Sequence, residues 1–295
     1  MIRARDGALL RSGTTAAVLV AVLTLSLTAC AGAASEPESS GSPDASGSPV
    51  AAGGIIALGH SGLTGENADP QRQGQEARDQ SWATGDDPAV DSIYLRMAAA
   101  DPVHEARAAN AASAGAVSES LASQAEWALG EVPEPALAII QTIDNDIHCD
   151  GSDAANVPLF GENLRAALET IAESSPDTAV LVVSQRGRPP MAADYFPIAA
   201  ENPAPGDESC EFINAAGEYV PANADHLTAV IESYEAEQAR VCGEFAQCSD
   251  DGGVNATFAD TEEDLAGGDG NHLTTAGQAR TAALLWPVVA GILGY

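Results

Sequence analysis

GIIALGHSGLTG, residues 54–65, begins as a fully apolar run and ends in a glycine-rich turn. A short apolar run bounded by glycines is typical of a strand buried in a parallel sheet. Runs of the same kind follow at residues 136–143 and 178–184. Helical patterns lie between and after them, at residues 119–129, 161–173, 225–240 and Thr275–Leu293, the last containing Pro287 as an expected kink or break. Alternating strands and helices predict an α/β domain whose parallel sheet is covered by helices on both faces.

A candidate nucleophile follows the first predicted strand directly. Ligands bind at the carboxyl ends of the strands in a parallel α/β sheet, and Ser61 lies at such an end, between glycines that allow a tight turn. The G-x-S-x-G elbow of α/β-hydrolases does not fit, because Leu63 occupies its last position. His60 adjoins the serine, and in an extended backbone its side chain is expected to point away from that of Ser61.

A serine hydroxyl needs a base, and the base needs an orienting group. His272 lies in the glycine-rich segment GGDGNHLT, residues 267–274, just before the last predicted helix. Asp269 is three residues upstream, near enough in a loop to accept a hydrogen bond from the imidazole. The alternative for this Asp-x-x-His pair is a capping turn without catalytic meaning.

Two further positions are candidate oxyanion donors. Asn145 lies in TIDND, residues 142–146, at the end of the second predicted strand, where its amide could stabilise negative charge. The alternative is an Asx turn. Gly115 could offer a backbone N–H, or could be only a small residue beside an Ala-rich helix.

Taken in chain order, the four blocks around Ser61, Gly115, Asn145 and His272 resemble those of the SGNH hydrolase family, also called GDSL esterases and lipases. The resemblance covers about residue 54 to the C-terminus. It implies a flavodoxin-like three-layer α/β/α sandwich and hydrolysis of esters or thioesters without a metal or cofactor. It also implies the site roles: Ser61 as nucleophile, His272 as base, Asp269 as its orienting group, and oxyanion donors from Ser61, Gly115 and Asn145.

The chain departs from the usual motifs at three positions. His60 stands where the family's G-D-S-L block has Asp, and Gly62 is inserted before Leu63. Ile143 replaces the first glycine of the G-x-N-D block. The serine and the asparagine are retained, so the departures concern substrate preference more than the presence of the chemistry.

The N-terminus has the features of a lipoprotein signal. Arginines precede an apolar stretch at residues 15–29, which ends in Leu-Thr-Ala-Cys at Cys30. This predicts a signal peptide over residues 1–30 with Cys30 lipidated, a flexible linker over 31–52, and a hydrolase-like domain over 53–295. The alternative is a plain secretory signal with an incidental cysteine. We expect an exported protein, anchored in the membrane through the lipid on Cys30 and facing outward.

The charge balance excludes some partners. Twelve basic residues, all of them arginine, face 43 acidic ones, for a net charge of −31. Such a surface repels phosphate backbones, so nucleic-acid binding is not expected. The acidity can reflect solubility, or adaptation to salty or cell-wall surroundings. We expect a monomer whose partners are a small-molecule or glycan ester and the membrane.

The cysteines suggest two disulfides. Of five cysteines, Cys30 stands apart, and the other four form an even set in the predicted domain. Three pairings are possible in an exported protein. We favour Cys149–Cys210 and Cys242–Cys248, because the second pair closes a short local loop. A zinc site is the competing interpretation, but no C-x-x-C spacing occurs. Disulfides are also frequent in secreted actinobacterial members of the family that the chain resembles.

Three functions are consistent with these patterns. The first is a serine esterase or lipase acting on lipid or short-chain acyl esters, with activity expected to fall below about pH 6.5 as the histidine base protonates. The second is a carbohydrate O-deacetylase, for which Trp82 could stack on a sugar, although ordinary loop packing is the favoured role of this residue. The third is a non-catalytic binding lipoprotein on the same scaffold, which the altered serine block motivates.

Overall fold

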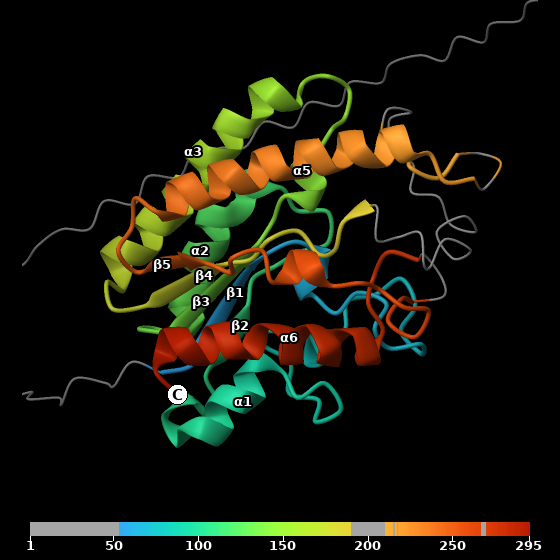
Figure 1. Ribbon diagram of the computed structural model, residues 1–295. Helices are drawn as coiled ribbons and strands as arrows, with labels where there is room; N and C mark the ends of the chain where they lie inside the picture. The colour runs from blue at the N-terminus through green and yellow to red at the C-terminus, as the bar shows by residue number, and fades with distance from the viewer. Residues whose placement is uncertain (1–52, 190–209, 215, 217, 267–269) are drawn as a thin grey trace, which may run out of the picture. The chain divides into compact units, whose positions relative to one another are not determined.

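A five-stranded parallel sheet runs through the centre of the computed structural model, which describes residues 53–189, 210–214, 216, 218–266 and 270–295. The strands are β1 (Ile55–Gly59), β2 (Ala108–Asn110), β3 (Leu137–Gln141), β4 (Ala179–Val182) and β5 (Cys248–Asp250). Their order is β2-β1-β3-β4-β5, which is the flavodoxin-like order with its switch point between β1 and β3 (Figure 1). The predicted fold class is therefore confirmed.

The two edge strands were not predicted from the sequence. The segments AAN of β2 and CSD of β5 are only three residues long and carry little apolar pattern. They are strands because a formed neighbour offers free backbone groups: Ala108 pairs in parallel register with Ile55, and Cys248 with Val180. Such pairing belongs to the assembled sheet and leaves no mark on a short local sequence.

Helices cover both faces of the sheet (Figure 1). One face is covered by α2 (Leu121–Glu131), α3 (Asp153–Ser174) and α5 (Pro221–Cys242), and the other by α1 (Ile93–Ala100) and α6 (Thr275–Leu293). Alternate residues of β1 serve the two layers, since Ile56 and Leu58 pack with α2 and α3 while Ile55 and Ala57 pack with α1 and α6.

The last helix does not divide at its proline. Thr274 caps α6 by accepting a hydrogen bond from the backbone N–H of Gly277 at 3.2 Å, and the helix continues through Pro287 to Leu293. Of the expected kink or division at Pro287, the division is wrong: Leu285 and Val289, on either side of the proline, are buried in the same layer of the core.

Both favoured disulfides are present. Cys149–Cys210 joins the turn that follows β3 to the segment before α5, and Cys242–Cys248 joins the end of α5 to β5. Across the described ranges, no helix combines the length and the apolar character needed to span a bilayer. The predicted lipoprotein signal, Cys30 and the linker lie outside the described residues.

Candidate active site

The corner after β1 is built by a close approach of two strands. Gly59 has a φ of +142°, and a Cβ at this position would lie 1.7 Å from the carbonyl oxygen of Gln141 on β3. Only glycine fits there. A single 3₁₀ turn, Ser61–Leu63, follows at once, and the side chain of His60 caps it by accepting a hydrogen bond from the N–H of Gly62 at 3.1 Å. The corner therefore holds Ser61 at the carboxyl edge of the sheet.

His60 faces the same pocket as Ser61, contrary to the expectation that it points away. The alternation of an extended chain stops at Gly59, where β1 ends and the turn begins, so consecutive side chains no longer take opposite sides. The His60 side chain is 4% exposed, and burial lowers its pKa, with the neighbouring Asp144 opposing the shift. Its Nε2 has no hydrogen-bond partner in the described part of the chain.

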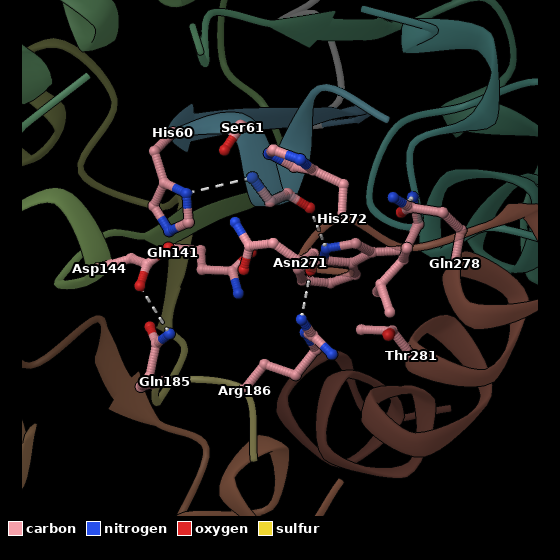
Figure 2. Close-up of a pocket in the computed structure, with 13 residues that line it drawn as sticks. His60, Ser61, Gln141, Asp144, Gln185, Arg186, Asn271, His272, Gln278 and Thr281 are labelled. Atoms are coloured by element: carbon pink, nitrogen blue, oxygen red, sulfur yellow. Dashed lines mark hydrogen bonds between the residues drawn. The ribbon is translucent and has the colours of Figure 1, made fainter. Parts of the chain in front are cut away.

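Segments far apart in the sequence meet in a small pocket at this edge (Figure 2). The pocket has a volume of about 40 Å³ and is lined by Ser61 and by His272, whose ring points toward the serine in Figure 2. The carboxyl ends of β3 and β4 contribute the opposite wall. The residues of that wall are Gln141, Asp144, Gln185 and Arg186.

The segment around His272 is tied down by its backbone and by an arginine. The carbonyl of His272 accepts from Ala266 N at 2.8 Å, and the carbonyl of Asn271 accepts from Arg186 Nη2 at 2.7 Å. Nε2 of His272 lies 3.4 Å from Oε2 of Glu66, a contact that becomes an ion pair when the imidazole is protonated. Asp269, its predicted orienting group, lies outside the described residues, so its role stays a prediction.

Buried carboxylates hold the β4 side of the pocket. Asp260 pairs with Arg186, and burial raises the pKa of that carboxyl while the guanidinium opposes the rise. Gln185 donates from Nε2 to Oδ1 of Asp144 at 3.2 Å, and its backbone N–H donates to Glu235 at 3.0 Å. Gln185 and Arg186 are therefore held in the wall by contacts with Asp144, which also lines the pocket, and with Glu235 and Asp260 behind it.

The profile of the family of GDSL-like lipases and acylhydrolases matches residues 55–285, which is most of the chain. The chain belongs to this family. The comparison with curated proteins gave no match.

Three solved structures are similar to this GDSL-like family member at low sequence identity. TesA is 15% identical, with a TM-score of 0.48 over 81% of this chain and 99% of its own. The phospholipase A1 of Streptomyces albidoflavus NA297 is 15% identical, with a TM-score of 0.48 over 82% of this chain and 99% of its own. The extracellular lipase of Streptomyces rimosus is 16% identical, with a TM-score of 0.48 over 82% of this chain and 100% of its own.

Asn145 and Gly115, the predicted oxyanion donors of this family member, lie near each other but do not line the pocket. Asn145 donates from Nδ2 to the carbonyl oxygen of Ala116 at 3.0 Å, which brings its turn against the segment that contains Gly115. Gly115 has a φ of +73° and no atom within 4 Å of a Cβ built on it. Neither of these two described residues lines the pocket, so their oxyanion roles stay predictions.

Trp82 supports the nucleophile corner from below. It is 1% exposed and packs among apolar residues of the α1 and α6 layer. Its indole N–H donates to the carbonyl oxygen of Gly62 at 3.0 Å, and its backbone N–H donates to Gln278 at 2.9 Å. The ring is packed, as favoured from the sequence, although the residue also contributes to the lining of the pocket.

Several pocket residues of this hydrolase were missed by the sequence reasoning. Gln141 is the last residue of β3, and Gln185 and Arg186 follow β4 closely. The signal was available, since a polar residue at the carboxyl end of an apolar strand in a parallel sheet lies at the ligand edge. Reading the chemistry of the strand ends, in addition to the family blocks, would have found them.

Proposed function

We propose that this GDSL-like family member is a serine ester hydrolase that forms an acyl-enzyme on Ser61. One observation carries the proposal: Ser61 and His272, from opposite ends of the domain, line the same pocket at the carboxyl edge of the sheet. A hydroxyl and an imidazole that share such a pocket can act as nucleophile and base.

The proposed reaction has two steps. Ser61 Oγ attacks the ester carbonyl carbon while His272 takes the hydroxyl proton, and His272 then gives that proton to the departing alcohol as the carbon–oxygen bond breaks. Water hydrolyses the acyl-enzyme with His272 again as base. Asp269 orients the imidazole, and the N–H groups of Ser61 and Gly115, with the Asn145 amide, receive the developing negative charge.

Fluorophosphonate labelling tests the proposal, because only an activated serine reacts quickly with this probe. The full-length chain in detergent should gain one phosphonyl group on Ser61 within minutes, and Ser61→Ala should gain none. Slow labelling together with no turnover on any p-nitrophenyl ester would favour the non-catalytic binding lipoprotein instead.

A carbohydrate O-deacetylase is the second candidate, and the small polar pocket favours it. The pocket is small, at about 40 Å³, and its wall carries the amides of Gln141 and Gln185, whose Oε1 atoms lack hydrogen-bond partners within the described segments. Such acceptors suit the hydroxyl groups of a glycan. Release of acetate from acetylated xylan or peptidoglycan, compared with cleavage of short and long p-nitrophenyl esters, separates a deacetylase from a lipase.

We further propose that the protein is an exported monomer anchored in the membrane through lipid on Cys30. The linker and the hydrolase-like domain then lie outside the membrane. The charged, apolar and small-residue pattern before Cys30 supports this. Cys30→Ala should move the protein from the membrane fraction to the soluble exported fraction. Retention of the variant in membranes would contradict lipid anchoring at this residue.

A further inference from the structure

His60 has a donor group that the fold leaves unused. Its Nδ1 accepts the hydrogen bond from Gly62 N, so the ring proton of the neutral imidazole resides on Nε2. That Nε2 is buried without a hydrogen-bond partner in the described chain, and the residue lines the pocket together with Ser61. Figure 2 shows the ring beside the serine, facing the space enclosed by Gln141 and Asp144.

The surroundings of His60 favour the neutral ring. Burial lowers its pKa, and the positive charges of Arg186 and of protonated His272 act in the same direction, while Asp144 and Asp146 oppose them. At neutral pH the pocket therefore contains an uncharged N–H donor. Burying a donor without a partner costs free energy, and a ligand in the pocket that accepts its hydrogen bond would remove that cost.

A donor that faces this pocket meets a need of the proposed reaction. When Ser61 Oγ bonds to the carbonyl carbon, the π-electron pair moves to the carbonyl oxygen, and the charge there needs fixed donors. One N–H of the Asn145 amide donates to the carbonyl oxygen of Ala116, and the residue does not line the pocket, so a donor that already faces the pocket would add to those proposed above. A neutral imidazole can serve as such an electrophilic donor without transferring its proton.

We propose that His60 is a catalytic oxyanion donor, whose Nε2–H donates a hydrogen bond to the substrate carbonyl oxygen as Ser61 attacks. The inference rests on the proposed esterase function. The proton stays on Nε2 throughout, and the bond strengthens as charge builds on the oxygen. The aspartate that the family usually has at this position would be ionised and could not donate, so this donor is particular to the chain.

Three substitutions of His60 distinguish its proposed role as a hydrogen-bond donor from its role as the cap of the turn. His60→Gln can place an amide N–H near the position of Nε2. His60→Asn keeps an acceptor for Gly62 N–H and remains a good cap, but has no donor that reaches the pocket. His60→Ala removes both. We expect kcat on a short p-nitrophenyl ester to fall about 10²-fold in His60→Asn and His60→Ala, with KM changed less than about threefold, and to recover about tenfold in His60→Gln.

One outcome refutes the inference alone, and another removes the esterase proposal on which it rests. A folded His60→Asn variant with wild-type kcat, in a preparation where Ser61→Ala is inactive, would refute the donor role and leave the esterase proposal intact. A wild-type chain with no turnover and no phosphonylation would remove the esterase proposal and the inference with it.

A measurement on the wild type covers the case in which every His60 variant unfolds. The phosphonyl oxygen of a fluorophosphonate adduct on Ser61 occupies the oxyanion position. The ¹H resonance of His60 Nε2–H should therefore move downfield in the adduct and exchange more slowly with water. An unchanged resonance would show that the donor is not directed at that oxygen.

Discussion

The corner after β1 and the corner after β3 lie side by side at the carboxyl edge of the sheet but are stabilised in different ways. The first, residues 59–64, is shaped by its backbone, with a glycine where β1 touches β3 and a short turn capped by His60. The second, residues 143–146, is held by side chains: Asn145 bonds Ala116, and Asp146 accepts from Ser118 and Thr142.

The difference concerns which polar groups remain available to a substrate. Backbone shaping at the first corner leaves Ser61 and the Nε2–H of His60 facing the pocket. Side-chain bonding at the second corner uses the polar groups of Asn145 and Asp146 to hold neighbouring loops. The Asn145 side chain therefore holds a neighbouring loop here and does not line the pocket.

The largest expected effect is loss of turnover when the first corner loses Ser61, the proposed nucleophile. Ser61→Ala should reduce kcat roughly 10³-fold or more, because the proposed acyl-enzyme forms on this hydroxyl. The measurement is hydrolysis of a short p-nitrophenyl ester, with the melting temperature as control for folding. Near-wild-type turnover in the purified variant would remove Ser61 from the mechanism.

Asn145→Ala tests whether the second corner also serves the reaction. If its amide turns to the oxyanion in the substrate complex, kcat should fall about 10²–10³-fold, as for one oxyanion donor. A loss below about tenfold would show that Asn145 acts only by holding Ala116. Asn145→Asp is the matched control, since it keeps the size but removes the N–H donors.

Gly59→Ala should break the backbone shaping of the first corner. The added Cβ would lie within 1.7 Å of the Gln141 carbonyl, at a φ of +142°. The loss in free energy of unfolding should reach about 3 kcal/mol or more, because strands β1 and β3 must separate locally. Urea unfolding measures it, and Gly74→Ala, at a positive φ but with open space around its Cβ, is the control.

Ile143 offers the corresponding test at the second corner. It has a φ of +97° at the position where the family usually has glycine, and its side chain is fully buried. Both Ile143→Ala and Ile143→Gly lose the buried side chain, but only glycine relieves the backbone. The glycine variant should therefore be more stable than the alanine variant by about 1 kcal/mol, the reverse of the usual order. An alanine variant that is the more stable of the two would argue against backbone strain at this corner.

The smallest expected effect is a pH dependence of stability that comes from His60. Burial holds its pKa below 6.5 in the folded chain, so the unfolded chain takes up this proton at higher pH. The contribution of buried, neutral His60 to the free energy of unfolding is fully present above about pH 6.5. It is lost as the pH falls toward the pKa of His60 in the folded chain. The melting temperature of the wild type should drop more between pH 7 and 5 than that of His60→Gln. Parallel curves would contradict this.

Much of the fold was predictable because its central elements carry their signals locally. Strands β1, β3 and β4 are fully or nearly fully buried, so their sequences are continuous apolar runs. The last helix was predicted with its observed bounds, and the disulfide between Cys242 and Cys248 closes a loop short enough to be read from spacing. Helix α1 was missed, because its eight residues are too few for a clear pattern.

The site was predictable as a set of blocks but not as a geometry. Ser61 and His272 were found from glycine-rich segments that adjoin a strand and a helix, and they do line one pocket. The turn of His60 toward the pocket, by contrast, depends on where β1 ends, and β1 ends where Gly59 meets Gln141. Likewise, the bond from Asn145 to Ala116 depends on how two loops pack.

The amino-acid sequence was enough to predict the α/β class, the parallel arrangement, the family and Ser61 as the candidate nucleophile, since these follow from apolar runs, turn residues and their order along the chain. Only the tertiary structure shows the edge strands β2 and β5. It also shows that His60 faces the pocket and that the amides of Gln141 and Gln185 form part of the pocket wall. The physical reason is that each of these features rests on contacts between segments distant in the chain. No local pattern of side chains encodes which backbone groups or pocket atoms a distant segment will meet.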